Sequence, residues 1–305
     1  MRLNEFDVKT LSPTSCIFII GKRHSGKTEL LISWCHELYK HGARGRKFDM
    51  VVVFSKTEKV QHNFVRFVPK GCIHSEFNEQ KLNQLLDLQH QLKNKNGSSH
   101  YILLILDDIA YKKGVFKSET FSRILFNGRH SNICVVCTTQ YCMNLPPEIR
   151  TNLDVIVSMR EPNHSNRKRL FDNFYGHFSS YKLFEKVLNE TTEDYGSLIA
   201  VNNGLEQTND ISKNVFWYRA SIESVPRTFK MGRDIYWRWS EQYRIRNQEE
   251  RLRLTNPKPN QTRQHYYEEE IKQVKKPAPR PEALQAQDQL TIVSRKQGNP
   301  LSFLF

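Results

Sequence analysis

The segment GKRHSGKT, residues 21–28, has glycine, lysine and threonine at the spacing of a phosphate-binding loop. Glycines allow successive backbone N–H groups to curl around phosphate oxygens, and the N-terminus of the following helix adds a positive dipole. In this pattern Lys27 contacts the β- and γ-phosphates of a nucleoside triphosphate, and the Thr28 hydroxyl coordinates Mg²⁺. We therefore expect ATP and Mg²⁺ as cofactors. The residues predicted to line the phosphates are Gly21, Lys22, Arg23, His24, Ser25, Gly26, Lys27 and Thr28.

The apolar run 101–106 ends in two carboxylates, Asp107 and Asp108. A pair of acids after a strand is by itself equally compatible with a helix cap, but a phosphate-binding loop requires such a second acidic motif. We predict that Asp107 coordinates Mg²⁺ together with Thr28, and that Asp108 orients or deprotonates the attacking water. The apolar run 50–54 fits the subclass of phosphate-loop proteins that places a strand between the two motif strands.

Two further side chains flank the apolar run 133–139. Gln140 follows this run, and at the end of a strand beside the γ-phosphate it would sense that phosphate or position water. Arg129 precedes the run, near the edge expected to carry the nucleotide. There it would either stabilise charge on a neighbouring subunit's nucleotide or pair with a surface carboxylate or phosphate. The candidate catalytic residues are Lys27, Asp108, Gln140 and Arg129, with Arg123 and Arg150 as the next candidates for the arginine.

Buried strands and helices must alternate to position these residues. The apolar runs read as strands are 15–20, 50–55, 101–108, 133–140 and 153–159, and the helical patterns between them are 28–39, 76–92 and 118–126. Continuous apolar strands that alternate with helices are typical of a parallel sheet covered on both faces. Two more helices, at 166–178 and 181–190, and a late pair of strands, at 197–203 and 214–220, follow. The sequence predicts an α/β phosphate-loop NTPase domain over residues 1–240, with its nucleotide core at about 14–160.

From about residue 241 the chain becomes polar, charged and rich in proline and glutamine. We expect residues 241–305 to form a largely disordered basic tail, because they contain too few apolar residues to bury. The stretch 234–246 is interpreted as a closing helix packed on the domain, with a docking segment for a partner as the alternative.

Charge and cysteine content limit the class of protein. The net charge of +14 favours a polyanionic partner, most simply nucleic acid. No signal peptide and no run of 18 apolar residues is present, so we expect no membrane segment and a soluble, intracellular, non-secreted protein. Cys134 and Cys137 lie three apart in a strand pattern and point to opposite faces, so buried structural cysteines are the better interpretation than a shared metal.

The motif order GKRHSGKT, LLILDD, NGRHSNICVVCTTQ and LPPEIRTNLDVIV resembles the DNA-packaging ATPases of large eukaryotic DNA viruses, members of the FtsK/HerA superfamily. The resemblance covers about residues 14–159, and its most specific part runs from Arg129 to Gln140, followed by Asn152. Asp108 departs from the superfamily, where glutamate is usual. The resemblance implies an RecA/FtsK-like fold, a homo-oligomeric ring, and ATP-driven translocation of double-stranded DNA into a preformed capsid. It also implies capsid or other packaging proteins as partners, and action at the virus assembly site of an infected host cell or in the virion.

Basic segments are candidates for sequence-independent contacts with DNA, although a solvated surface is the simpler reading of any single one. They are residues 41–47, Lys112, Lys113, Lys117 and residues 167–169. Two other functions stay open at this point: a phosphate-loop nucleotide or nucleoside kinase, and a DNA-binding scaffold whose nucleotide site is regulatory.

Overall fold

The computed structural model describes residues 3–112, 114–141, 145–202, 210–221, 223, 225–226 and 228–255, with side chains through residue 248. The chain divides into two units, Met1–Trp237 and Arg238–Phe305. The first unit contains a nine-stranded sheet, in the order β1-β9-β8-β7-β2-β6-β5-β3-β4. The strands are β1 (Asn4–Glu5), β2 (Cys16–Ile20), β3 (Met50–Ser55), β4 (Ile73–His74), β5 (Ile102–Asp107), β6 (Ile133–Thr139), β7 (Val155–Ser158), β8 (Gly196–Val201) and β9 (Val215–Arg219).

The sheet is mostly parallel. From β4 to β7 all neighbouring strands pair in parallel, whereas β8 pairs antiparallel with both β7 and β9. β2, β3, β5 and β6 are buried along their whole length. Burial on both faces explains why these strands are continuous apolar runs without alternation. The predicted α/β fold with a mostly parallel sheet is confirmed.

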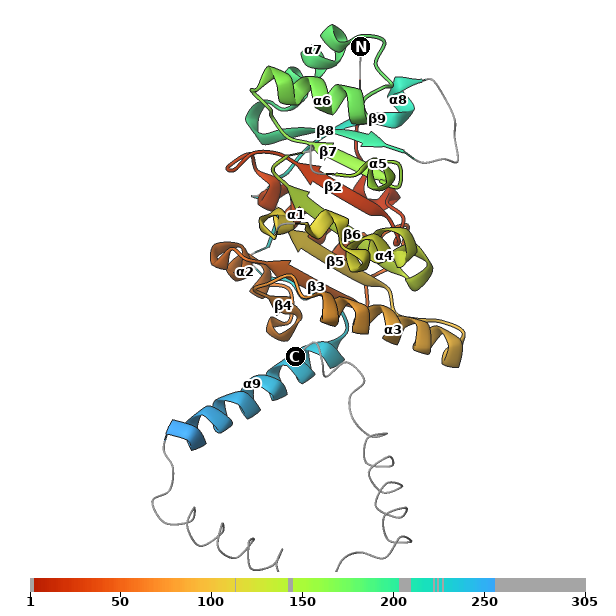
Figure 1. The fold of residues 1–305 in the computed structure, drawn as a ribbon. Helices are drawn as coiled ribbons and strands as arrows, with labels where there is room; N and C mark the ends of the chain where they lie inside the picture. Colours follow the sequence, from red (N-terminus) through yellow and green to blue (C-terminus); the bar gives the residue numbers. More distant parts are fainter. Residues whose placement is uncertain are drawn as a thin grey trace, which may run out of the picture. The chain divides into compact units, whose positions relative to one another are not determined.

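Helices connect the strands and cover the sheet, and α3 and α4 lie on its near face in Figure 1. The helices are α1 (Lys27–His41), α2 (Glu58–Val65), α3 (Glu79–Asn96), α4 (Glu119–Asn127), α5 (Pro147–Arg150), α6 (His164–Phe174), α7 (Tyr181–Thr191), α8 (Ile211–Asn214) and α9 (Asp234–Thr255). Side-chain caps start several of them, as when Asn78 accepts from the backbone N–H of Lys81 at the start of α3. Such a cap satisfies one of the unpaired N–H groups of the first turn.

The buried cysteines have no disulfide partners. Cys134 and Cys137 are both buried and free, as is Cys35. Burial raises the pKa of the Cys35 thiol to about 12, so this thiol stays protonated at neutral pH. The structural role predicted for the cysteines of β6 agrees with this burial. Cys142 lies outside the described residues.

The long helix α9 begins in the first unit and continues into the second. Tyr236 is buried, and its hydroxyl contacts Nδ1 of His100 at 2.7 Å. The helix then runs to Thr255, past residue 241, where we expected the disordered tail to begin. The expectation of disorder is therefore wrong for residues 241–255, because their Arg, Glu, Leu and Gln residues favour a helix even without an apolar face. Residues 256–305 lie outside the described residues.

Candidate nucleotide site

The phosphate-binding loop connects β2 to α1, as predicted. Its backbone is tight: a Cβ on Gly21 would lie 2.6 Å from both Met159 Cβ and Ser25 Oγ, so only glycine fits there. Gly26 caps α1 with a φ of +93°, a left-handed conformation that glycine adopts without strain. The loop therefore aims the N-terminus of a 15-residue helix into the site.

Lys27 is held against its own loop. Its Nζ donates to the carbonyl oxygens of Gly21 and Lys22. Burial lowers the pKa of Lys27, and the negative charges of Asp108 and Asp107 oppose this effect. Ser25 Oγ is buried in the same loop and has no hydrogen-bond partner in the described structure. A cationic amine and an unpaired hydroxyl at a helix N-terminus suit an oxygen-rich anion such as a triphosphate.

The two acids at the end of β5 lie in different environments. Asp107 is only 6% exposed, and its two oxygens accept hydrogen bonds from Ser55 Oγ and Thr138 Oγ1, both at 2.8 Å. Burial raises the pKa of Asp107, and these two hydrogen bonds oppose the rise. Asp108 is in the left-handed region, with a φ of 47°, and its N–H donates to Thr138 Oγ1 at 2.9 Å. The hydroxyl of Thr138 thus connects both acids.

Gln140 completes this cluster. Its Nε2 donates to Oδ2 of Asp108 at 2.6 Å, which joins the residues that follow the neighbouring strands β6 and β5. The amide therefore holds the carboxylate in one orientation. A carboxylate that is fixed in this way can receive a proton from a nearby water without first having to reorient.

A cavity of about 760 Å³ brings the predicted residues together. It is lined by Arg23, His24, Ser25, Gly26, Lys27, Thr28, Glu29, Thr57, Lys59, Val60, Asn63, Asp107, Asp108, Gln140, Tyr195 and Ala220. Lys22 lies beside it and pairs with Glu161 at 3.0 Å. Of the candidate site residues, Gly21 and Lys22 flank this cavity, and only Arg129 lies at another part of the fold.

The oxygen atoms at the site fit Mg²⁺. The Thr28 hydroxyl and the Asp107 carboxylate line one cavity, and Mg²⁺ prefers such oxygen ligands together with phosphates and waters. The described residues contain no group of three or more His, Cys, Asp or Glu that could hold a metal by itself. The donor set therefore fits a cation that arrives with a nucleotide better than a permanent protein-bound metal.

Arg129 lies at the opposite end of the sheet from the phosphate loop. It belongs to the short 3₁₀ segment Gly128–Ser131 before β6, and its guanidinium pairs with Asp154, which precedes β7, at 3.4 Å. Because β2, β6 and β7 are parallel, their amino ends lie together, about 20 Å along the strands from their carboxyl ends. The expectation that Arg129 lies near the nucleotide edge is wrong. Pairing with a carboxylate, the alternative, is what the structure shows.

Sequence reasoning missed several residues of the site, among them Ser55, Thr138 and Tyr195. Ser55 ends the apolar run of β3 and Thr138 precedes Gln140, so their positions at strand ends were an available signal. Tyr195 precedes β8 and is far from every motif in the sequence. No local pattern singles it out.

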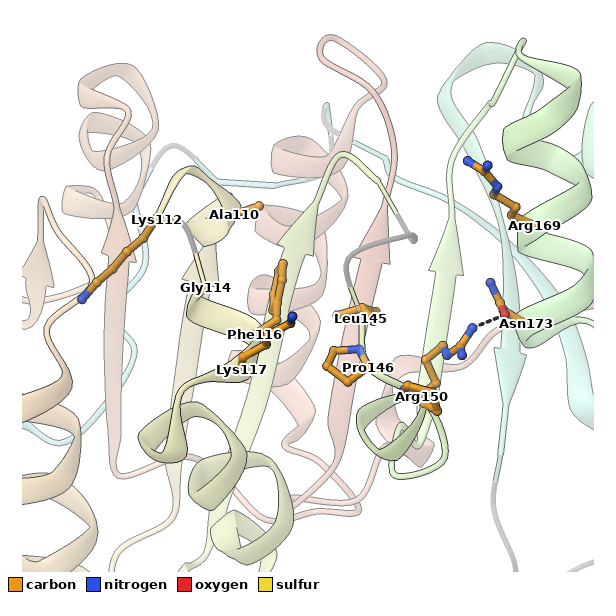
Figure 2. Close-up of a pocket in the computed structure, with 11 residues that line it drawn as sticks. Ala110, Lys112, Gly114, Phe116, Lys117, Leu145, Pro146, Arg150, Arg169 and Asn173 are labelled. Atoms are coloured by element: carbon orange, nitrogen blue, oxygen red, sulfur yellow. Dashed lines mark hydrogen bonds between the residues drawn. The ribbon is translucent and has the colours of Figure 1, made fainter.

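A second cavity, of about 900 Å³, is strongly basic. Figure 2 shows its charged side chains, Lys112, Lys117, Arg150 and Arg169, spread across its width, with Phe116, Leu145 and Pro146 between them. None of its lining residues is acidic, although the ammonium of Lys112 pairs with Glu79 at 3.4 Å. The fold thus gathers Lys112, Lys117 and Arg169, predicted separately as DNA contacts, around one groove and adds Arg150. Residues 41–47 do not line it, and Lys113 lies outside the described residues.

Comparison with known proteins places these features in a family. Residues 4–174, more than half of the chain, match the poxvirus A32 protein family. The chain belongs to this family. The matched residues include the phosphate loop, both acids, Arg129 and Gln140. The resemblance to DNA-packaging ATPases of large eukaryotic DNA viruses is therefore confirmed.

Individual relatives of this A32 family member are viral proteins. An uncharacterized protein of Invertebrate iridescent virus 3 is 31% identical over 69% of this chain and 77% of its own length. An uncharacterized protein of Acanthamoeba polyphaga mimivirus is 31% identical over 72% of this chain and 77% of its own length. Among solved structures, the genome packaging NTPase B204 of Sulfolobus turreted icosahedral virus 2 in complex with ATP-gammaS is 17% identical. It covers 68% of this chain and 98% of its own, with a TM-score of 0.48.

Proposed function

We propose that this A32 family member is an ATPase that couples Mg²⁺-dependent ATP hydrolysis to the movement of double-stranded DNA during viral genome packaging. One observation carries the hydrolytic part. The phosphate loop, Asp107, Asp108 and Gln140, which come from three strands, line a single cavity, and the Thr138 hydroxyl is hydrogen-bonded to both acids. The family supports the packaging role.

Each residue of the cavity has a defined task in this proposal. Lys27 exchanges its loop carbonyls for the β- and γ-phosphate oxygens of ATP. Thr28 and Asp107 would hold Mg²⁺, which neutralises phosphate charge when bound. Asp108 accepts the proton of the attacking water, and Gln140 keeps its carboxylate in place.

The basic groove supports DNA as the partner. A single small anion requires cations that converge on one point, whereas a linear polyanion is matched by cations spread along its path. The arrangement in Figure 2 is of the second kind. One wall begins at Ala110, two residues after Asp108, and Leu145 to Arg150 of the other wall lie beyond Gln140. Asp108 and Gln140, which are hydrogen-bonded to each other in the nucleotide site, therefore each lie a few residues along the chain from one wall of the groove.

The assembly and place of action follow from the same proposal. A packaging motor that grips DNA by its backbone would work as a homo-oligomeric ring with capsid or other packaging proteins, at the virus assembly site or in the virion. No helix in the described part of the chain is long and apolar enough to span a bilayer.

Phosphate release from ATP, measured with and without linear duplex DNA and with nucleoside monophosphates as acceptors, tests this function. We expect Mg²⁺-dependent release that DNA stimulates and that acceptors do not change. Phosphoryl transfer to a monophosphate would indicate a kinase, and nucleotide binding without turnover would indicate a regulatory scaffold. Lys27→Ala, checked for its fold by circular dichroism, should abolish turnover. A folded variant with undiminished turnover would exclude this site as the source of activity.

The groove itself is tested by charge removal. Lys117→Ala and Arg150→Ala should weaken duplex binding uniformly across sequences and reduce the slope of log K against log salt by roughly one each. Basal ATP hydrolysis, measured without DNA, should not change in Lys117→Ala. Lys186→Ala is the matched control, because Lys186 is exposed and paired with Glu190 on α7, away from the groove. Equal effects of all three variants would show a non-specific role of net charge.

A further inference from the structure

We propose that Tyr195 is a stacking platform for the nucleobase of the bound nucleotide. This inference rests on the proposed nucleotide site and adds to it a contact that is independent of the phosphates. Tyr195 lies in the short 3₁₀ segment Glu193–Tyr195, between α7 and β8.

Tyr195 is presented to solvent in an unusual way. Its side chain is 69% exposed, more than any other large hydrophobic or aromatic residue among those described. Its φ is +61°, and Asp194 before it has a φ of 45°. A bulky residue in the left-handed region is an outlier, and such strain concentrates at ligand sites. Packing does not explain the conformation, since the ring is not buried.

The surrounding chain holds this turn in place. Thr192 Oγ1 donates to the carbonyl of Leu188 at 2.6 Å, and Arg219 donates to the carbonyl of Glu193 at 3.2 Å. A Cβ on Gly196 would lie 2.1 Å from the carbonyl oxygen of Thr191, so the chain passes as close to the end of α7 as glycine permits. The strained turn is thus fixed from both ends, and the exposed ring is positioned before any ligand arrives.

The ring lies next to the phosphate loop. A Cβ on Gly26 would be 3.2 Å from Tyr195 Cδ1 and 3.3 Å from its Cβ, and Tyr195 lines the same cavity as Lys27 and Asp107. A planar, exposed aromatic ring at this position offers a face to another planar group. Stacking on aromatic side chains stabilises bound bases in this way.

The sheet order sets the direction of the nucleotide. β5, which carries the acids, lies two strands from β2 on one side, and β8, which follows Tyr195, lies two strands from β2 on the other. Each is displaced from the loop strand by about 10 Å. A triphosphate whose γ-phosphate faces Asp107 and Asp108 across the phosphate loop therefore extends its sugar and base toward Tyr195.

Calorimetric binding of ATP and of inorganic tripolyphosphate separates a base contact from a phosphate contact. Tyr195→Ala should weaken ATP binding roughly 5- to 100-fold and leave tripolyphosphate binding unchanged. Tyr195→Phe, which keeps the ring, should bind ATP like the wild type. Tyr195→Ala should weaken GTP binding as much as ATP binding, because stacking does not discriminate between bases. Tyr243→Ala removes a tyrosine that is 41% exposed in the second unit and serves as the matched control.

Tyr195→Asn is a second ring-deletion variant, since asparagine tolerates a left-handed backbone and preserves the turn. Unchanged ATP affinity in both ring-deletion variants overturns the proposal. Equal weakening of ATP binding and tripolyphosphate binding also overturns the proposal, and it would show that Tyr195 maintains the conformation of the phosphate loop. Unchanged affinity with an altered oligomeric state assigns it instead to a subunit contact. A wild-type protein that binds neither ligand refutes the proposed nucleotide site, a result distinct from a failure of the tyrosine variants alone.

Discussion

Thr138 is the residue that determines the geometry of the two acids. Its hydroxyl donates to Asp107 and accepts from the N–H of Asp108, so it uses both its donor and its acceptor capacity within the site. Asp107 is buried, and a buried carboxylate stays ionised only where hydrogen bonds or cations compensate for the lost hydration. The neighbours of the acids therefore control the site as much as the acids themselves.

Thr138→Val tests this dependence. The substitution keeps the shape of the side chain, removes one hydrogen bond to Asp107 and leaves the N–H of Asp108 unpaired. We expect the Mg²⁺ concentration for half-maximal ATP hydrolysis to rise roughly 10-fold, as is typical when a hydrogen-bond partner of a metal ligand is lost. Thr139→Val is the matched control, because Thr139 is equally buried but bonds to the carbonyl of Tyr141 and does not contact the acids. The same Mg²⁺ dependence in both variants would contradict a specific role of Thr138.

At the scale of elements, the sheet edge formed by β4 contains a half-buried histidine. Burial, together with the positive charge of Lys81, lowers the pKa of His74 to about 4. Nδ1 of His74 lies 3.4 Å from Nζ of Lys81, and Nε2 is buried without a partner in the described structure. His74 is therefore neutral in the folded protein over a pH range in which it is protonated in the unfolded chain.

This difference makes stability depend on pH with a definite sign. Between about pH 6.5 and 4 the unfolded state binds one more proton at His74, so the free energy of unfolding falls as the pH falls. Over the whole window the loss is about 3 kcal/mol. His74→Phe preserves packing against Phe54 and should remove this part of the acid sensitivity, measured by urea unfolding at pH 7 and pH 4.5. An equal loss of stability in both proteins between these two pH values would show that His74 does not contribute.

At the scale of the whole molecule, the position of Arg129 constrains how a ring could be built. A contact from Arg129 to a neighbouring nucleotide requires the amino ends of the strands of one subunit to face the carboxyl ends of the next. Its pairing with Asp154 is exposed and contributes at most about 1 kcal/mol to stability. The role of Arg129 in trans stays a prediction.

Mixing of subunits tests that prediction. If Arg129 acts in trans, Arg129→Ala retains ATP affinity and loses most turnover, and mixing it with Lys27→Ala restores part of the activity. Arg129→Lys should rescue poorly, because an ammonium lacks the planar fork of a guanidinium. Normal turnover of Arg129→Ala, or no recovery in confirmed mixed assemblies, would show that Arg129 does not act in trans, and Arg123 and Arg150 would then be the next candidates.

Truncation after Thr255 tests the role of the last 50 residues. These contain eight Lys and Arg against five Asp and Glu, so their removal should lower duplex affinity at low salt by a small factor. Basal ATP hydrolysis should stay near that of the full chain, because the cavity is built from residues 23–220. The cut follows α9, since a cut at residue 241 would divide this helix. Loss of folded protein after a cut at residue 241, but not after a cut at Thr255, would show that residues 241–255 are needed for folding.

The sequence by itself determined the parts of this protein that depend on local spacing. The phosphate loop, the acids after β5 and Gln140 after β6 follow strands whose continuous apolar character is visible in one dimension, and the structure places them in one cavity. The tertiary structure decided which distant residues meet. Thr138 and Ser55 on Asp107, Tyr195 over Gly26, and four cations around one groove depend on strand order and on crossovers between strands. Arg129 was misplaced for the same reason: a residue that precedes a parallel strand lies at the opposite end of the sheet from one that follows it, and only the pairing of the strands fixes which end is which.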